Sequence, residues 1–530
     1  MVPEDAESHL LPLPRVERAA HGPGARLGDL VHALDVAGFG SGWQDVRITG
    51  LALDSRRTAP GDLFCALAGE NAHGLAHWPD AEARGARALL LDRGATPPTR
   101  SVGIQADRPR QVLAAMASRL YGNPAADLRL IGVTGTNGKT TTVHMVHQIL
   151  EAAGRQSGYW STAWVDGGRG PFRPQMTTPE APDLQAFLAK ARDSGATDAV
   201  LEVSSHGVVL DRLAGLRFRA GVATNMTPDH LDFHGSFAAY RAAKERFIAE
   251  LPADGHAILN ASDPVVRTFS RSSQARVVMY GWGAGCDVGA EAVSVDAVSA
   301  RFRLFVGGEA VTWVNLPVPG RHNVLNALAA LAATLTDGIP WQVATAALQR
   351  FEAPVRRLEP FVVGPYTVIN DVAMNQGSYE AVMAAMRDLE RPLVVVNALR
   401  GNRGTEVNRA IAETLGRWDR ELHFAPVVGT TSDPEVARLS VDYRVRPEEL
   451  EAFLDAADAA GLAVSIHRTL DSAVEEGVER VPPGGVLLLL GTFGMDDGPE
   501  WAVRRLARRA GVNFMGLPHT ERRLYREPES

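Results

Sequence analysis

The segment IGVTGTNGKTTTV, residues 131–143, decides how the chain can fold. Residues 128–133 form a short apolar run that predicts a buried strand, and residues 140–153 have the pattern of a helix. Between them lies the glycine-rich sequence GTNGKTT, residues 135–141. A glycine-rich turn between a strand and a helix directs backbone N–H groups inward around phosphate oxygens. The segment therefore predicts a phosphate-binding loop in an α/β domain.

The residues of this loop have separate expected tasks. Lys139 would neutralise the β- and γ-phosphates of a nucleotide, and the Thr140 hydroxyl would ligate Mg²⁺. The strict spacing GxxxxGK[ST] is not met, because residue 133 is valine. A flexible glycine turn is the competing interpretation, and the alignment of strand, GKT triplet and helix disfavours it. The predicted ATP-binding residues of the loop are Gly135, Thr136, Asn137, Gly138, Lys139, Thr140 and Thr141.

Strand-like and helix-like segments alternate on both sides of the loop, which favours parallel, doubly wound sheets. With 530 residues the chain is too long for one core. Breaks at 121–124 and 351–354 suggest where it divides. We predict an α/β protein of three domains, with a Rossmann-like C-terminal domain and a smaller α/β N-terminal domain flanking the phosphate-loop domain. The predicted limits are a leader over 1–26, an N-terminal domain over 27–122, a central phosphate-loop domain over 123–353 and a C-terminal domain over 354–530.

The composition is that of a globular protein, with 45% hydrophobic and 22% charged residues. A net charge of −8 argues against non-specific binding to nucleic acid or to an anionic membrane surface. The two cysteines, Cys65 and Cys286, suit a reducing cytosol better than a disulfide framework. No apolar run is long enough to span a bilayer, and the N-terminus lacks the pattern of a signal peptide. We expect a cytoplasmic monomer that binds small molecules, but neither nucleic acid nor membrane.

Lysine is rare in this chain. Of 54 basic residues only three are lysines, namely Lys139, Lys190 and Lys244. A genomic preference for arginine codons explains the scarcity, but a lysine kept under that bias marks a position where arginine would not serve. We interpret Lys190 as a solvated helix residue, which leaves Lys139 and Lys244 as candidates for chemistry that needs an amine.

Several segments together resemble the Mur ligases, the amide-forming enzymes of peptidoglycan synthesis, and most closely the MurE type. They are the loop itself, EVSSH at 202–206, TNMTPDHLDFH at 224–234 with YRAAK at 240–244, GRHNVLNA at 320–327, and ITGLALDSRR with PGDLF over 48–64. The resemblance implies an ATP-dependent ligase that joins an acid to an amine through an acyl phosphate. In the MurE type the acid is UDP-N-acetylmuramoyl-L-alanyl-D-glutamate and the amine is an amino acid.

The resemblance also implies two Mg²⁺ ions. Glu202 would join Thr140 on one ion, because a carboxylate at the carboxyl end of a strand offers the oxygen that Mg²⁺ prefers; a surface carboxylate is the alternative interpretation. His230 would bind the second ion. Lys244 would react with CO₂ to give a carbamate, which turns a cation into an anionic ligand and is closed to arginine. Lys139, Lys244 and His230 are accordingly the predicted catalytic residues.

The same resemblance assigns residues to the two larger substrates. Asn323 would lie near adenine, although an asparagine that caps a helix is a fair alternative. Arg357 would approach the phosphates, and Asp371 would complete the ATP site from the C-terminal domain. The residues expected to hold the UDP-sugar-peptide are Leu53, Ser55, Thr177, Thr178, Ser204 and Arg212, together with the loop at 70–74.

The C-terminal domain departs from the resemblance. The family signature DYAHxPD is replaced by DVAMNQG over 371–377, and GGDRDxxKR by RGNRGTE over 400–406, where only Arg403 roughly matches. The DNPR motif that reads a diamino acid is absent near 430–435, and GKGHE is replaced by GTFGMDD over 491–497. The nucleotide machinery thus matches the family, whereas the site for the amine does not.

Three functions stay open on this basis. The first is a MurE-type ligase that adds an amino acid to the UDP-sugar-dipeptide. The second is a Mur-like ligase that uses a different acid or amine in a secondary-metabolite or polymer pathway. The third is a non-catalytic nucleotide-binding protein, which the full set of phosphate and metal motifs disfavours.

Overall fold

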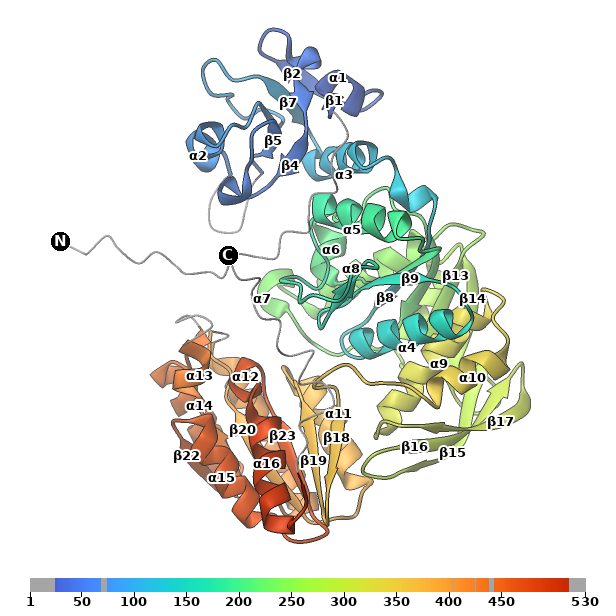
Figure 1. Cartoon of the computed structure of the whole chain (residues 1–530), viewed down its shortest axis with the longest axis vertical. Coiled ribbons are helices and arrows are strands. Elements are labelled where there is room, and N and C mark those ends of the chain that lie inside the picture. Colours follow the sequence, from blue (N-terminus) through green and yellow to red (C-terminus); the bar gives the residue numbers. More distant parts are fainter. Residues whose placement is uncertain (1–23, 68–73, 403, 425, 438–442, 514–530) are drawn as a thin grey trace, which may run out of the picture.

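The chain folds into three α/β domains in a computed structural model that describes residues 24–67, 74–402, 404–424, 426–437 and 443–513 (Figure 1). Arg403 and residues 70–73 of the predicted UDP loop lie outside these ranges, as do most of the predicted leader residues. Within them, no helix is long and apolar enough to cross a bilayer. The predicted α/β architecture of three domains is confirmed.

The N-terminal domain is built on a five-stranded sheet in the order β2-β7-β6-β5-β4. Its strands are β2 (Ala37–Phe39), β4 (Gly50–Ala52), β5 (Asp62–Cys65), β6 (Ala88–Asp92) and β7 (Gly103–Ala106), beside the short pair β1 (Ala25–Arg26) and β3 (Arg47–Ile48). Its helices are α1 (Leu27–Leu30), α2 (Trp78–Ala83) and α3 (Pro109–Leu120). Alternate residues of β5 and β6 enter separate apolar clusters on the two faces of the sheet, which is why residues 63–65 and 88–91 are apolar without interruption.

The central domain carries a ten-stranded sheet in the order β10-β9-β11-β8-β12-β13-β14-β15-β16-β17. Its strands are β8 (Arg129–Thr134), β9 (Ser157–Trp160), β10 (Val165–Asp166), β11 (Asp198–Glu202), β12 (Phe218–Ala223), β13 (His256–Asn260), β14 (Arg276–Trp282), β15 (Val288–Val295), β16 (Ala300–Val306) and β17 (Glu309–Leu316). Its helices are α4 (Lys139–Ala152), α5 (Ala181–Asp193), α6 (Ser205–Val209), α7 (Leu231–His234), α8 (Phe237–Ala249), α9 (Arg321–Leu335) and α10 (Trp341–Leu348). Strand β8 pairs in parallel with β11 and β12, so the segments that follow these three strands meet at one edge.

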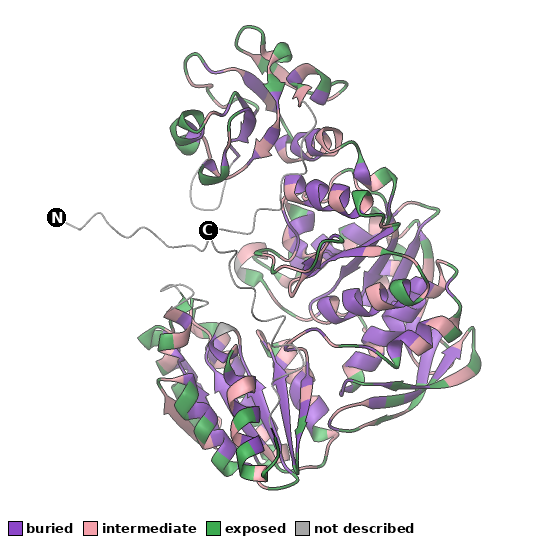
Figure 2. Cartoon of the chain, viewed as in Figure 1, coloured by how far each residue is buried: buried purple, intermediate pink, exposed green. Residues whose placement is uncertain are grey.

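Helices cover both faces of the parallel part of this sheet, as a doubly wound fold requires. Val143 of α4 and Leu328 of α9 belong to the apolar cluster on one face. Phe187 of α5 and Phe247 of α8 belong to the cluster on the other. Figure 2 shows the resulting layers, with buried strands between helices whose outer surfaces are exposed.

Both ends of the central sheet differ from the all-parallel expectation. At one end β10 is antiparallel to β9, and at the other β16 is antiparallel to both of its neighbours, β15 and β17. Along β16, Phe302 and Leu304 are buried while Arg301 and Arg303 are exposed, the alternation typical of a sheet with one solvated face. The β16–β17 hairpin turns at residues 307–308, two glycines with φ of +60° and +84°. The alternation of apolar and charged residues and the glycine pair are both visible in the sequence, but our prediction did not use them.

The C-terminal domain is a six-stranded sheet in the order β18-β19-β23-β20-β21-β22, parallel except for the edge strand β18. Its strands are β18 (Glu359–Val363), β19 (Tyr366–Asp371), β20 (Leu393–Ala398), β21 (Val427–Thr430), β22 (Val464–His467) and β23 (Val486–Leu490). Its helices are α11 (Gln376–Arg387), α12 (Thr405–Leu422), α13 (Asp433–Ala437), α14 (Pro447–Ala459), α15 (Leu470–Arg480) and α16 (Gly498–Ala510). This is the Rossmann-like arrangement that the sequence predicted.

Candidate active site at the phosphate loop

The phosphate loop leaves β8 at Thr134 and enters α4 at Lys139. Gly135 and Gly138 have φ of +136° and +84°, which other residues rarely adopt. A Cβ atom at Gly138 would lie 2.3 Å from Asn326 Oδ1 of α9. The two glycines are therefore required by the backbone conformation and, at Gly138, by the close approach of α9.

Residues after β12 hold the loop from the side. The backbone N–H of Asn137 donates to Asn225 Oδ1 at 2.9 Å, and Asn225 Nδ2 donates to Asn137 O at 3.0 Å. Thr224 Oγ1 donates to the same carbonyl at 2.6 Å. Because these bonds come from the protein itself, the shape of the loop is built before a nucleotide binds.

Two lysines meet at one carbonyl of the loop. Lys139 Nζ donates to Gly135 O at 3.0 Å and to Thr136 O at 2.9 Å, and Lys244 Nζ donates to Gly135 O at 2.8 Å. Burial lowers the pKa of Lys139. Burial, with the positive charge of Lys139 as a second cause, lowers the pKa of Lys244 well below its ordinary value. The structure thus brings both predicted catalytic lysines to the same point and favours the neutral amine at Lys244.

Tyr240 supports Lys244 from one turn earlier in α8. The ammonium nitrogen of Lys244 lies 4.9 Å from the centre of the Tyr240 ring, and the Tyr240 hydroxyl donates to Thr136 Oγ1 at 3.1 Å. Residues four apart share one face of a helix, so the YxxAK spacing delivers both side chains to the loop. The motif is visible in the sequence, but we predicted no role for Tyr240 from it.

The structure brings Glu202 and Thr140 together at the carboxyl end of β11. Thr140 Oγ1 donates to Glu202 Oε1 at 2.7 Å, and Glu202 is 1% exposed. The N–H and the hydroxyl of Thr162 also donate to this carboxylate, at 2.7 and 2.9 Å. A buried carboxylate beside a loop hydroxyl fits Mg²⁺, which binds through one or two carboxylates plus substrate phosphates. Thr162 is a residue of the site that sequence analysis did not find, since nothing in its neighbourhood marks it.

His230 begins α7 at the rim of the site. It has a left-handed φ of +52°, and its backbone N–H donates to Asp229 Oδ1 at 2.9 Å. Its ring is exposed and lies edge-on to His206, with 4.8 Å between ring centroids. Across the described ranges, no three acidic, histidine or cysteine side chains gather closely enough to hold a metal ion. A second ion at His230 would therefore need ligands beyond these side-chain types.

The predicted nucleotide residues differ in what they face. Asn323 is buried, with Nδ2 donating to Pro319 O at 2.8 Å and Oδ1 accepting from Asn326 Nδ2 at 3.0 Å. Both ends of its amide are thus engaged near the start of α9, and Asn326 is the residue that meets the loop. Arg357 Nη2 lies 3.5 Å from Thr140 Oγ1. Burial raises the pKa of Asp371 to about 6, against the charge of Arg357, and its Oδ2 accepts from Leu358 N at 2.8 Å.

Four of the six predicted substrate residues adjoin Glu202. Thr178 Oγ1 donates to Glu202 O at 2.7 Å and accepts from Ser204 N at 2.9 Å. Arg212 donates to Thr178 O at 3.0 Å, and the hydroxyl oxygens of Thr177 and Thr162 lie 3.0 Å apart. These residues form one chain of contacts that leads from the carboxylate toward the N-terminal domain.

Leu53 and Ser55, the other two predicted substrate residues, lie in the N-terminal domain before and after the cap residue Asp54. Close to them, Arg57 pairs with Asp183 of α5 at 3.2 Å. A second pair joins the same two domains, between Arg110 and Glu180 at 2.9 Å. These contacts orient the N-terminal domain over the central one, although Leu53 and Ser55 are not in the Glu202 cluster.

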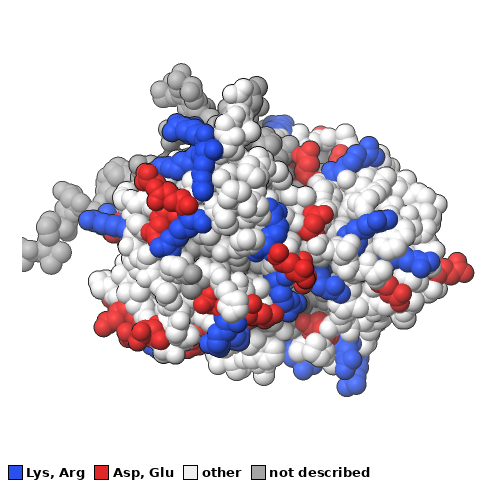
Figure 3. Space-filling model, turned by 90° about the horizontal axis from the view of Figure 1, so that it is seen from below, with Lys and Arg blue, Asp and Glu red and all other residues white. Residues whose placement is uncertain are grey.

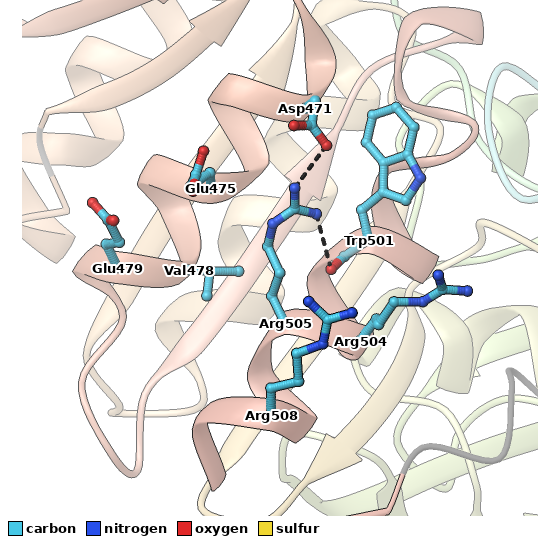
Figure 4. A pocket seen from close by; sticks show the side chains of 8 residues that line it. All are labelled: Asp471, Glu475, Val478, Glu479, Trp501, Arg504, Arg505 and Arg508. Carbon is cyan, nitrogen blue, oxygen red and sulfur yellow. Dashed lines mark hydrogen bonds and ion pairs between the residues drawn. The ribbon is translucent and has the colours of Figure 1, made fainter. Parts of the chain in front are cut away.

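A separate hollow of about 530 Å³ lies between α15 and α16 (Figure 4). Arg505 spans it, since its guanidinium pairs with Asp471 at 2.7 Å and donates to Trp501 O at 3.5 Å. All of its lining residues come from these two helices. The hollow is therefore distinct from the phosphate-loop site.

On the face shown in Figure 3, basic and acidic side chains of the described residues are interspersed.

Two family models match the chain. The Mur ligase family catalytic domain matches residues 47–121, and the Mur ligase middle domain matches residues 133–334. The UDP-N-acetylmuramoyl-L-alanyl-D-glutamate–2,6-diaminopimelate ligase of Syntrophomonas wolfei is 31% identical over 441 residues, which are 82% of this chain and 90% of that protein. The protein of the same name from Chlorobaculum tepidum is 34% identical over 488 residues, 88% of this chain and 92% of that one.

The chain belongs to the Mur ligase family. It is an ATP-dependent ligase, as the relatives and both domain matches show. A solved structure of a ligase with the same name as those relatives covers 92% of this chain and all of its own, with a TM-score of 0.65 and 22% identity. MurF of Thermotoga maritima, solved with ADP, covers 87% of this chain and 98% of its own at a TM-score of 0.62 and 19% identity. These structural likenesses extend the shared fold through the C-terminal domain of this Mur ligase, beyond the end of the middle-domain match.

Proposed function

We propose that this Mur ligase joins an amine to the free carboxylate of UDP-N-acetylmuramoyl-L-alanyl-D-glutamate. The names of its relatives state this acid for those proteins. The observation that carries the proposal is the contact chain from Glu202 through Thr178 to Ser204 and Arg212. It supports an acid site beside the phosphate loop, where an acid must lie to be phosphorylated. The function would serve peptidoglycan synthesis.

The reaction proceeds in two steps that need no covalent enzyme nucleophile. A carboxylate oxygen attacks the γ-phosphorus of ATP, the bond to the bridging oxygen breaks, and ADP leaves. The free amine then attacks the acyl carbon, the C–O bond to phosphate breaks, and the amine nitrogen loses a proton. Lys139 neutralises charge on the transferring group. Mg²⁺ held by Thr140 and Glu202 would supply further neutralisation there.

A carbamate on Lys244 is part of the proposal. Two positively charged lysines at Gly135 O would repel each other. A neutral Lys244 amine would attack CO₂, form an N–C bond and lose a proton. The product is an anion, so the repulsion with Lys139 becomes an attraction. The carbamate and His230 would then hold the second Mg²⁺.

The amine is proposed to differ from the diamino acid that the relatives' names state. In the segments that stand in place of the family's C-terminal motifs, the chain has Asn402, Asp433 and Met495. The same departure supports a second candidate, a Mur-like ligase with another acid as well as another amine. We also propose a cytoplasmic monomer with the domain limits 27–122, 123–353 and 354–530.

The release of ADP separates these candidates. Purified protein with ATP, Mg²⁺, bicarbonate and a mixture of amino acids should release ADP only when UDP-N-acetylmuramoyl-dipeptide is added. A coupled ADP assay measures this directly. Release that needs a different acid would favour the second candidate, and nucleotide binding without release under any condition would favour the non-catalytic one.

Replacing Glu202 by glutamine is expected to raise the Mg²⁺ concentration for half-maximal ADP release at least about tenfold. The amide keeps the size of the side chain and can still accept from Thr140, but it lacks the negative charge that binds the ion. The matched control is Glu250→Gln, at the end of α8, where the carboxylate pairs with Arg246. An unchanged Mg²⁺ dependence in Glu202→Gln would remove Glu202 from the metal site.

A further inference from the structure

The C-terminal domain contacts the central domain directly beside the phosphate loop. Asn375 Nδ2 donates to Asp229 Oδ2 at 2.7 Å, across 146 residues of sequence. Two residues later, a Cβ atom at Gly377 would lie 2.8 Å from Thr227 Oγ1 and 3.1 Å from Asn137 Nδ2 of the loop. The start of α11 is therefore packed against the loop with no room for a side chain at residue 377.

Asn375 is fixed on its own side of this contact. Its Oδ1 accepts from the N–H of Ser378 at 2.9 Å, and the Ser378 hydroxyl accepts from the N–H of Asn375 at 3.0 Å, which together cap α11. The amide oxygen is thus used by the helix, and the NH₂ group is directed at Asp229. Tyr379 and Met383 of α11 are buried in the core of the C-terminal domain, so Asn375, which caps this helix, is rigidly attached to that domain.

Asp229 is equally fixed on the central side. Its Oδ1 accepts from the N–H of His230 and so holds the left-handed turn at that residue. Two residues before it, the N–H of Thr227 donates to Thr136 Oγ1 at 3.0 Å, which ties the same segment to the phosphate loop. The Asp229 carboxylate therefore fixes the turn at His230 and binds the C-terminal domain. It belongs to the same segment that Thr227 ties to the phosphate loop.

We propose that Asn375 is a positioning residue that couples the placement of the C-terminal domain to the assembly of the phosphate site. Its bond to Asp229 holds the amine-delivering domain against the loop while the same carboxylate fixes the turn at His230. A hydrogen bond to an ionised carboxylate is stronger than one between neutral groups. Contacts of Arg357 with Thr140 at 3.5 Å and of Arg173 with Asp496 at 4.0 Å also join the two domains, and both are longer than the 2.7 Å bond from Asn375 to Asp229.

The test uses substitutions that keep the helix cap and change only the contact. Aspartate and serine both cap helices well. Asn375→Asp places a carboxylate against Asp229, whereas Asn375→Ser removes the amide NH₂ group that donates to Asp229 and adds no charge. The reciprocal exchange, Asn375→Asp with Asp229→Asn, restores an amide facing a carboxylate in the opposite direction. Thermal unfolding of each full-length variant checks that the fold is kept.

Small-angle X-ray scattering with ATP analogue and Mg²⁺ reports the placement of the domains and needs neither acid nor amine. We expect a larger radius of gyration for Asn375→Asp, a smaller increase for Asn375→Ser and the wild-type value for the double exchange. ADP release should fall at least about tenfold in Asn375→Asp and return to within about threefold of wild type in the exchange. If the protein does not use the proposed UDP substrate, the wild type will release no ADP either. The scattering measurement still tests the role of Asn375, because it needs no acid.

Two results would overturn the proposal. One is an Asn375→Asp protein whose scattering profile matches that of the wild type. The other is a double exchange that stays as expanded as Asn375→Asp, since a residue needed only for folding or for capping α11 would not be rescued by its partner.

Discussion

Lys139→Ala is expected to lower the rate of ADP formation at least about a hundredfold. In the structure its ammonium group is held by the carbonyls of Gly135 and Thr136 at the mouth of the loop. The positive charge of Lys139 would stabilise the negative charge of the γ-phosphoryl group during transfer. Alanine has no charge to do this. A coupled ADP assay under saturating ATP measures the loss.

Lys190→Ala is the matched control for this variant. Lys190 lies near the end of α5, so its removal takes away one lysine without touching the loop. We expect an unchanged rate of ADP formation for it. If Lys139→Ala also kept the wild-type rate with each acid, the assignment of this loop to ATP would fail, whatever the family resemblance.

The second large effect is expected at Lys244. Lys244→Ala should lower ADP formation at least about a hundredfold, because the anionic ligand proposed to neutralise Mg²⁺ charge would be lost. Short carboxylic acids such as acetate should restore part of the activity by occupying the space of the missing carbamate. Lys244→Arg should stay inactive with or without acetate, because a guanidinium neither reacts with CO₂ nor leaves room for the acid.

The pH dependence gives this prediction a second readout. The pKa of Lys244 is lowered, so the neutral amine that reacts with CO₂ is present above that lowered pKa and is lost as pH falls through it. Removing CO₂ and bicarbonate should therefore reduce wild-type activity, and added bicarbonate should rescue it less at acidic than at neutral pH. Full activity of Lys244→Ala without acetate would rule out the carbamate.

Local patterns in the sequence were enough to predict the core of the fold. The predicted strand, loop and helix around Lys139 appear as β8 and α4. Buried parallel strands are short apolar runs, so they can be recognised without their neighbours. The pairing of Glu202 with Thr140 could also be anticipated, because both follow parallel strands whose carboxyl ends share one edge.

The parts that were not predicted depend on contacts between distant segments. Asn323 was assigned to adenine from its motif, but a motif does not show that its amide is engaged by Pro319 and Asn326. Thr162 lies in a loop after β9 with no distinctive neighbours, and only the folded sheet brings it to Glu202. Asn375 was given no role in the sequence, and its contact with Asp229 appears only once two domains are packed.

The identity of the amine depends on the least conserved part of this resemblance. The matched middle domain ends at residue 334, and the likeness of the C-terminal domain to solved structures is one of fold. A shared Rossmann-like fold does not fix which side chains line its loops. The residues proposed for phosphorylation therefore lie in the part of the chain that the family models match, whereas those for the acceptor lie beyond it.

The most direct test of the central claim is mass spectrometry of the products formed from UDP-N-acetylmuramoyl-dipeptide, ATP and a panel of amines. We expect one new UDP-linked product, whose mass equals that of the dipeptide substrate plus one amine minus water, together with one ADP per product. The amine in it should not be diaminopimelate. ADP formation without any UDP-linked amide, or no turnover of this acid with any amine, would contradict the account.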